Sequence, residues 1–440
     1  MKMRARAWDP DRWRPFFFAI WGGQVFSLLG SQVVQFALVW WLTKTTESGT
    51  VLAMATIAAV LPGVVLGPFI GPLIDRWSRR RVMIVADASI ALSTVLLAAL
   101  FAFGVARPWH VYLIMFARSI GSAFHWPSMQ ASTTLMVPEK HYGRIAGLNQ
   151  SLLGAANIVG PALGAFLIEI LPMQGVLAVD VLTAALAVVP LLWIAIPQPK
   201  SPDTVAPSFF REMAEGFRLL LSWPGLLGVV VIAALLNFLF APAGSLIPLL
   251  VIRHFGGGAF HLAGLKMATG FGIIFGGVIL TAWGGFRRRM ATALFGVVFL
   301  GVGALLLGLT PPSLFWLAIV AAAITGIMQP IANGSIMAAL QASTSPDMQG
   351  RMFALLGSAS GMMMPIGLLL AGPLSDRFGA NVWFLIGGGA AILLGSIGFF
   401  IPAIMNLEAQ GAGLAAAREA ANGPPTDETQ AMEARTPASR

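Results

Sequence analysis

The stretch Gly71-Pro72-Leu73-Ile74-Asp75-Arg76-Trp77-Ser78-Arg79-Arg80-Arg81 places four arginines between two long apolar segments, near 51–70 and 82–104. In the whole chain of 440 residues only 10% are charged. Arginine-rich short loops stay on the cytoplasmic side when a membrane protein is inserted. The stretch therefore predicts a tight cytoplasmic loop that joins two transmembrane helices.

The composition supports a membrane protein. Hydrophobic residues make up 57% of the chain and the mean hydropathy is +0.81, whereas a soluble domain is about 45–50% apolar and about 25% charged. The net charge of +9 comes from short clusters between apolar segments, which indicates membrane topology and argues against nucleic-acid binding. Because the chain has no cysteine, disulfides, thiol nucleophiles and thiolate metal sites are excluded.

Apolar runs long enough to cross the hydrocarbon core, about 20 residues each, predict an all-α membrane protein with twelve transmembrane helices. They lie near 16–42, 51–72, 82–104, 110–136, 146–170, 175–196, 224–252, 260–284, 290–309, 314–342, 350–373 and 381–405. With both termini in the cytoplasm, 21 of the 27 lysines and arginines fall on the inner side and four on the outer side. This asymmetry supports the number of spans and a multi-pass location in the plasma membrane.

The chain divides into two six-helix halves. We expect a basic cytoplasmic N-terminus at 1–15, bundles at 16–196 and 224–405, a cytoplasmic inter-bundle loop at 197–223 and a disordered cytoplasmic tail at 406–440. Within the loop, Phe210, Met213, Phe217 and Leu221 share one helical face and predict an amphipathic interfacial helix, a plain solvated linker being the alternative.

Sequence repeats suggest that the halves are duplicated. Arg79–Arg81 recurs as Arg287–Arg289, and Gly143-Arg144 recurs as Gly350-Arg351. The stretch Gly372-Pro-Leu-Ser-Asp376-Arg377 also mimics the opening motif, although the span count places it on the outer side. It is either an inverted-repeat counterpart of the first copy or a chance similarity.

The pattern Gly-x-x-x-Asp-Arg-x-x-Arg-Arg resembles the loop between helices 2 and 3 of major facilitator transporters. Residues 29–38, 66–87 and 209–217 resemble the macrolide-efflux and siderophore-exporter branch of that family. The resemblance implies two pseudo-symmetric bundles that rock to export a hydrophobic small molecule by proton antiport. It also implies a conformational gating motif made of Gly71, Asp75, Arg76, Arg79 and Arg80.

Charged residues inside apolar spans are costly, by roughly 2.5–3.5 kcal/mol each on insertion scales, and are therefore functional candidates. Arg118 shares a helical face with Ser122, His125 and Met129, which predicts a cavity lining. A structural arginine paired with a buried carboxylate is the alternative. The candidate proton-coupling set consists of Arg118 and the protonatable groups Asp180, Glu169 and Asp87.

Each of the three carboxylates in this set also has a purely structural interpretation. We expect Glu169 and Asp180 at the outer mouth, where they either exchange protons or occupy ordinary interfacial positions. For Asp87 we favour local pairing with the cluster Arg79–Arg81. Lys266 lies near the outer end of its span, from which it could reach the membrane surface or face a cavity.

Uncharged polar residues follow the faces of several spans. Gln24, Ser27, Ser31 and Gln35 form a stripe on the first span, and further candidates are Asn237, Gln329 and Asn333. The family resemblance implies that spans 1, 4, 7 and 10 line the substrate cavity, whereas helix–helix hydrogen bonding is the alternative. The fifth span carries Gly154, Gly160, Pro161 and Gly164, which resemble the antiporter motif of exporters.

The sequence contains none of the enzyme motifs that we considered. None of the five lysines follows a glycine, so there is no phosphate-binding loop and we expect no nucleotide. We also expect no metal and no cofactor, the energy coming from the proton gradient. The expected partners are a hydrophobic small molecule and the lipid bilayer, with the protein acting as a monomer. A proton-coupled importer of a small metabolite, and a lipid or lysolipid flippase or transport-dead membrane partner, are the competing hypotheses.

Overall fold

A computed structural model of the protein describes residues 13–197, 218, 220–344, 352, 356–357 and 360–411. The N-terminal bundle consists of α1 Trp13–Thr46, α2 Gly49–Arg76, α3 Arg79–Ala102, α4 Pro108–Met136, α5 Tyr142–Ile170 and α6 Met173–Trp193. The C-terminal bundle consists of α8 Pro224–Leu249, α9 Ala259–Trp283, α10 Arg289–Leu309, α11 Phe315–Ala342, α13 Met363–Phe378 and α14 Ala380–Phe400. Short helical turns lie at Glu139–His141, Leu250–His254, Pro312–Leu314 and α15 Pro402–Met405.

The predicted all-helical membrane fold is confirmed. Ten helices in the described residues are long and apolar enough to cross a membrane. The other two, α4 and α13, differ for separate reasons: α4 carries a polar face that includes Arg118, and the described part of α13 has 16 residues. The twelve-span topology therefore stays a prediction.

Local chemistry explains where several helices begin and end. In lipid the backbone must satisfy its own hydrogen bonds, which favours uninterrupted helices. Ser48 caps α2 by accepting a hydrogen bond from the amide of Val51, and Pro108 and Pro224 open α4 and α8, where a missing N–H costs nothing. The chain leaves α13 through Gly379, whose φ of 92° is favoured only by glycine.

The opening motif is mostly helical and is not the predicted loop. Helix α2 continues through Gly71 and Asp75 to Arg76, and α3 begins at Arg79, so that Trp77 and Ser78 alone lie between the helices. Backbone hydrogen bonds close both ends of this link, from Trp77 N to Leu73 O at 3.0 Å and from Val82 N to Ser78 O at 3.0 Å. The motif thus extends the helix, because α2 keeps its backbone pairing beyond the apolar run.

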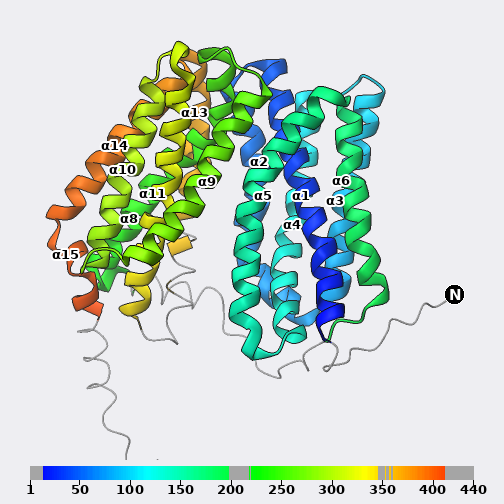
Figure 1. The fold of residues 1–440 in the computed structure, drawn as a ribbon, viewed down its shortest axis with the longest axis horizontal. Helices are drawn as coiled ribbons and strands as arrows, with labels where there is room; N and C mark the ends of the chain where they lie inside the picture. The colour runs from blue at the N-terminus through cyan, green and yellow to red at the C-terminus, as the bar shows by residue number, and fades with distance from the viewer. Residues whose placement is uncertain are drawn as a thin grey trace, which may run out of the picture.

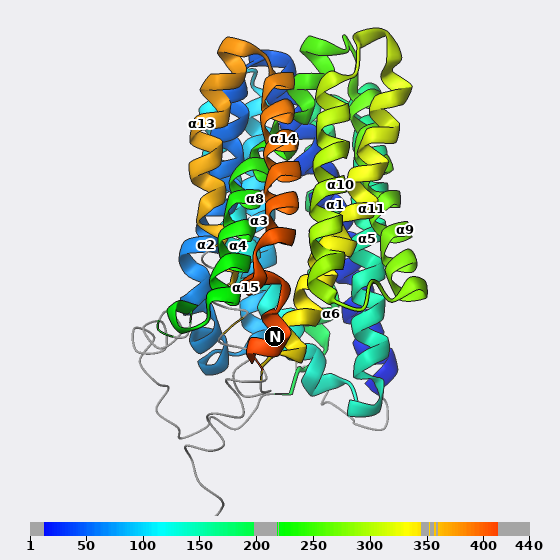
Figure 2. The same ribbon diagram turned by 90° about the vertical axis from the view of Figure 1, so that its left-hand side faces the viewer.

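The two bundles are joined at one end and separate at the other (Figures 1 and 2). One core cluster includes Trp40 and Leu52 from the N-terminal bundle and Leu249 and Trp383 from the C-terminal bundle. We call the end that carries this cluster and the α1–α2 connection the joined end. At the opposite, separated end each bundle has a core of its own, around Phe17 in one and Leu226 in the other.

Helices α2 and α13 form a close backbone contact between the bundles. A Cβ atom on Gly372 would lie 2.8 Å from the Cα of Thr50, and one on Gly49 would lie 3.0 Å from the carbonyl oxygen of Gly372. The first distance is shorter than real side chains show and the second is tighter than most of them, so glycine at the two positions lets the backbones approach closely. This contact anchors the joined end.

The segments outside the bundles are described only in part. The predicted amphipathic residues Phe210, Met213 and Phe217 lie outside the described residues, as does most of the inter-bundle loop 197–223. The prediction of a disordered tail from 406 begins too early, because residues 407–411 are helical and Leu407 is fully buried. Glu408 in this turn forms an ion pair with Arg289 at 3.0 Å. The rest of the tail lies outside the described residues.

Candidate functional site

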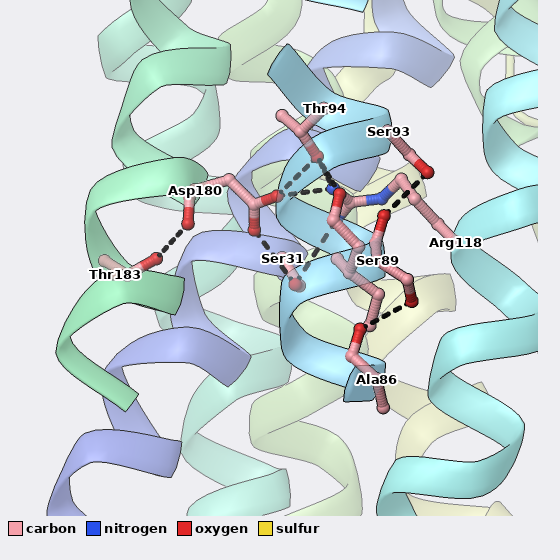
Figure 3. Close-up of polar contacts among 9 residues, drawn as sticks. Ser31, Ala86, Ser89, Ser93, Thr94, Arg118, Asp180 and Thr183 are labelled. Atoms are coloured by element: carbon pink, nitrogen blue, oxygen red, sulfur yellow. Dashed lines mark hydrogen bonds and ion pairs between the residues drawn. The ribbon is translucent and has the colours of Figure 1, made fainter. Parts of the chain in front are cut away.

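A buried ion pair lies in the middle of the N-terminal bundle. Nη1 of Arg118 on α4 contacts Oδ2 of Asp180 on α6, and the side chains are 11% and 1% exposed. The hydroxyl of Ser31 on α1 donates to Oδ1 of Asp180 at 3.0 Å, and Oγ1 of Thr94 on α3 lies 2.9 Å from Oδ2. Figure 3 shows these four side chains converging from four helices.

Hydroxyl groups around the pair stabilise the charges of Arg118 and Asp180 inside the bundle. Nη1 of Arg118 also contacts the Thr94 hydroxyl, and Nη2 donates to Ser31 at 3.3 Å. A buried ion pair compensates its desolvation only when further hydrogen bonds satisfy both partners, and here the hydroxyls of Ser31 and Thr94 do so. The carboxylate of Asp180 and the guanidinium of Arg118 thus neutralise each other inside the bundle.

A second carboxylate in the same bundle has different partners. Oδ1 of Asp87 on α3 lies 3.3 Å from Nε2 of His125 on α4, and Nε2 of Gln24 on α1 donates to Oδ2 at 3.1 Å. Asp87 is 2% exposed. The predicted pairing with Arg79–Arg81 is therefore wrong for this residue, because its side chain turns along the bundle toward α1 and α4.

Three cavities lie along the inner faces of the bundles. A cavity of about 160 Å³ in the N-terminal bundle is lined by residues that include Gln24, Asp87 and His125. A second, of about 430 Å³, lies between the bundles, and a third, of about 390 Å³, lies within the C-terminal bundle. Lys266 lines both of the larger cavities.

The sequence profile described as Major Facilitator Superfamily matches residues 20–368. The chain belongs to the major facilitator superfamily. It is 36% identical over 402 residues to Macrolide efflux protein A of Streptococcus pyogenes, covering 90% of this chain and 98% of that protein. It is 26% identical over 393 residues to the Multidrug efflux pump Tap of Mycolicibacterium fortuitum, covering 86% and 94% respectively.

Solved structures agree with this membership at the level of the fold. A bacterial homologue of the human lysosomal transporter Spinster, described as inward-facing and unoccupied, superposes with a TM-score of 0.66 at 16% identity, covering 91% of this chain and 96% of that one. A D-xylose–proton symporter superposes with a TM-score of 0.64 at 16% identity, covering 87% and 96%. The chain is thus a multi-pass membrane protein of a transporter family.

In this major facilitator protein the predicted cavity residues fall into separate compartments. The cavity of the N-terminal bundle is lined by Gln24, Ser27, Ser31, Ser122, His125 and Met129. Gln35 lines the cavity between the bundles, and Asn237, Gln329 and Asn333 line that of the C-terminal bundle. The stripe predicted on the first span is therefore shared between two cavities.

The predicted proton-coupling residues are only partly brought together. Arg118 and Asp180 are in contact, and Asp180, the eighth residue of α6, lies inside the bundle and not at the predicted outer mouth. Glu169 is exposed near the end of α5 and has no ion pair among the described residues. The structure thus separates Glu169 from the buried pair.

The gating motif contacts neighbouring helices of its own bundle. Nη1 of Arg79 donates to the carbonyl of Ala131 on α4 at 2.7 Å. Arg80 donates through Nη2 to the carbonyl of Leu192 on α6 at 2.7 Å, and its Nε contacts the carbonyl of Leu191. Cations at the C-terminal end of a helix are favourable. Gly71 lies within α2, and the side chains of Asp75 and Arg76 lie outside the described part of the chain.

The antiporter-like positions on α5 allow a close helix contact. A Cβ on Gly160 would lie 2.6 Å from Cβ of Gln32 on α1, and one on Gly164 would lie 2.8 Å from Cδ1 of Phe36. Pro161 lines the cavity between the bundles, and a Cβ on Gly154 would lie 3.8 Å from Cγ1 of Ile274 on α9. Helix α5 therefore packs its small residues against α1 and meets the other bundle.

Two residues outside the predicted site are prominent in the structure. The sequence predicts Lys266 near the end of its span, and the structure places it in two cavities. Asp376 stands out in the sequence only as part of a repeated motif, and it contacts the other bundle through four hydrogen bonds. A charge inside an apolar span is the signal for Lys266, and the repeated Gly-Pro-Leu-x-Asp-Arg pattern is the signal for Asp376.

Proposed function

We propose that this protein exports hydrophobic, macrolide-like small molecules in exchange for protons by alternating access. The relatives named as macrolide and multidrug efflux proteins match it over most of their length, which supports export and the class of substrate. Apolar walls with scattered amide and hydroxyl groups in the two larger cavities suit a bulky ligand of that kind.

The observation that carries proton coupling is the buried contact between Arg118 and Asp180. A carboxylate in this position can take a proton only by giving up its attraction for the guanidinium. Protonation then frees Arg118 to rearrange against α1 and α3, and loss of the proton restores the pair. Asp87, which lies 3.3 Å from His125, is a second buried carboxylate of the same bundle and belongs to the proposed coupling set.

The arrangement of the cores supports an inward-open resting state. The bundles share a core at the joined end and have separate cores at the other end, so we assign the separated end to the cytoplasm. Twelve spans, cytoplasmic termini and a monomeric unit without nucleotide complete the proposal. Substrate would enter between the bundles from the cytoplasm and leave when the joined end parts.

Transport in everted membrane vesicles tests the proposal. We expect a labelled macrolide to accumulate when a proton gradient is imposed and to stop accumulating when a protonophore is added, with no effect of sodium or of nucleotide removal. Arg118→Ala should abolish this accumulation at equal abundance in the membrane. Accumulation that persists without the gradient would contradict proton antiport, and accumulation only in right-side-out vesicles would favour an importer.

The topology has a direct test because the chain contains no cysteine. Single cysteines at Ser78 and Arg288 should react with an impermeant thiol reagent only from the cytoplasmic side. Cysteines at Ser48 and Ser313 should react only from outside. Reaction of all four cysteines from the same side of the membrane would contradict the assignment of the two ends.

A further inference from the structure

Lys266 is a cation without a described counterion, and it lines both of the larger cavities described above. It is the eighth residue of α9, about 10 Å along the helix at a rise of about 1.5 Å per residue. Its neighbours in the lining are amides and hydroxyls, among them Gln35, Asn237 and Gln329. Neither lining contains an aspartate or a glutamate, and Lys266 makes no hydrogen bond or ion pair with the residues that the structure describes.

In the N-terminal bundle, by contrast, the buried charges have partners. Asp180 is paired with Arg118, and Asp87 is placed beside His125. Lys266 is half-buried. An ammonium group has three donors and no acceptor, and a charge that is partly withdrawn from water without a partner is costly. A ligand that brings an oxygen acceptor to Lys266 would remove this cost, whereas a ligand that brings a cation there would increase it.

We propose that Lys266 selects the substrate by binding an oxygen acceptor, a carboxylate best and a carbonyl or hydroxyl next, and by rejecting a cationic group at that position. This proposal rests on the proposed export function and specifies the chemistry of its substrate. Phe36, Phe240 and Phe384 supply apolar walls around the same space. The substrate class is accordingly an oxygen-rich amphiphile, such as a macrolactone, whose oxygens face α9 and whose apolar body contacts the aromatic walls.

A matched series of small ligands tests the selection without requiring transport. The purified protein would be titrated with 4-phenylbutanoate, 4-phenylbutanamide and 4-phenylbutylammonium, and binding would be followed by thermal stabilisation. We expect the wild type to bind the carboxylate at least about tenfold more tightly than the ammonium ion, the size of one charge-assisted hydrogen bond. Lys266→Met should remove this preference, and Lys266→Arg should keep part of it.

The exposed lysine Lys44 on α1 provides the control, because Lys44→Met removes the same charge away from the cavities and should leave the preference unchanged. An unchanged preference in Lys266→Met, or no binding of any of the three ligands to the wild type, would overturn the assignment. If the wild type shows the preference but exports no macrolide, the proposed export function fails and the role of Lys266 stands.

A second inference comes from an independent observation at the joined end. The carboxylate of Asp376, in the last turn of α13, accepts four hydrogen bonds from the start of α2. Gly49 N donates to Oδ1 at 2.5 Å, and Oδ2 accepts from Ser48 Oγ at 2.9 Å and from Thr50 N and Oγ1 at 3.0 and 2.6 Å. An acidic group at a helix N-terminus is favourable because it satisfies free amides and opposes the helix dipole.

This contact crosses between the bundles. Asp376 belongs to the motif Gly372-Pro-Leu-Ser-Asp376-Arg377, which repeats Gly71-Pro-Leu-Ile-Asp75-Arg76 at the other end of α2. We infer that Asp376 is a latch that holds the joined end closed by capping α2. When the bundles part at this end, the hydrogen bonds between the Asp376 carboxylate and the start of α2 must break, and water must take the place of each partner.

Distance measurements between spin labels test the latch, with labels on single cysteines introduced at Lys44 and Phe378, both exposed at the joined end. Asp376→Ala should shift the distribution toward longer distances, and Thr50→Val should give a smaller shift in the same direction because it removes one donor. Arg377→Ala, a change at the neighbouring exposed position, is the control and should leave the distribution as in the wild type. Identical distributions in Asp376→Ala and the wild type would overturn the latch.

Discussion

Nη1 of Arg118 contacts Oδ2 of Asp180 at a point where helices α1, α3, α4 and α6 all contribute a polar group. The pair lies within one bundle and not between the two. Its charge state therefore acts first on the packing of the N-terminal bundle, and only through that packing on the relation between the bundles.

Removing one partner of this pair should destabilise the protein and stop coupled transport. Arg118→Ala leaves the carboxylate of Asp180 buried without its cation, a change that costs about 3–5 kcal/mol in buried pairs. We expect a lower thermal midpoint and no gradient-driven export. Arg118→Lys should restore little activity, since an ammonium cannot reproduce the guanidinium geometry.

The double variant Arg118→Ala with Asp180→Ala provides the control for folding. It removes both charges, so its thermal midpoint should return toward the wild-type value while export stays absent. Export at the wild-type rate by Arg118→Ala would contradict a role of the pair in transport.

Coupling should depend on Asp180 more than on Glu169. Asp180 is buried beside Arg118, whereas Glu169 is exposed at the end of α5. Asp180→Asn should reduce the dependence of export on the proton gradient, and Glu169→Gln should leave it close to the wild type. Counterflow of labelled substrate, which needs no gradient, would show whether binding survives in each variant. Equal effects of the two substitutions would contradict this ranking.

Arg79 and Arg81 form a matched pair for testing the gating motif. Arg79 is 8% exposed and donates to the Ala131 carbonyl at 2.7 Å, whereas Arg81 is exposed. Arg79→Ala should strongly reduce export at normal abundance in the membrane because it removes a buried donor between α3 and α4. Arg81→Ala should export nearly as the wild type does. Normal export by Arg79→Ala, or with Asp75→Asn, would argue against the motif as a gate.

The latch at Asp376 should be insensitive to pH near neutrality. Burial alone would raise the pKa of this carboxyl, but hydrogen bonds from Thr50, Gly49 and Ser48 lower it below the ordinary value of 3.8. A depressed pKa means that the contact is fully present above the ordinary pKa and is lost as the pH falls through the folded value.

The spin-label distances at the joined end provide the readout for this pH dependence. The contribution of Asp376 to closure of the joined end should be constant between about pH 5 and about pH 8, so the spin-label distances of the wild type should not change over this range. Asp376→Asn should give longer distances at each of these pH values. The ion pair between Glu47 and Arg253, at 3.8 Å, is a second charged contact near this end, and Glu47→Gln provides its control. Opening of the wild type, but not of Asp376→Asn, on acidification from pH 8 to pH 6 would contradict the assignment.

The helices can be predicted from the sequence because each crossing needs a long apolar run, and such a run is a local property of the chain. Their ends are less predictable. The stretch Gly71–Arg76 contains Gly, Pro and two charged residues, as a loop would, yet it continues α2, because a helix can extend beyond the apolar region wherever its backbone remains paired.

The partners of the buried charges cannot be predicted in the same way. Periodicity places Arg118 on a polar face, but it cannot show that Asp180 lies opposite, 62 positions later in the chain. For Asp87 the arginines nearby in the sequence are the obvious predicted partners. The packing of α1 and α4 against α3 instead brings Gln24 and His125 to its carboxylate. Proximity between helices is a property of the assembled bundle, which a single sequence does not encode in any local pattern.

Because the core at the joined end takes residues from both bundles, it can be packed only after the second bundle has been synthesised. Helices α1 to α6 leave the ribosome first, and Trp40 and Leu52 then have no counterpart until Leu249 and Trp383 have been inserted. A nascent chain that stops after the first bundle is consequently an assembly intermediate with an uncovered packing surface. We therefore expect the two bundles to be completed together as one unit.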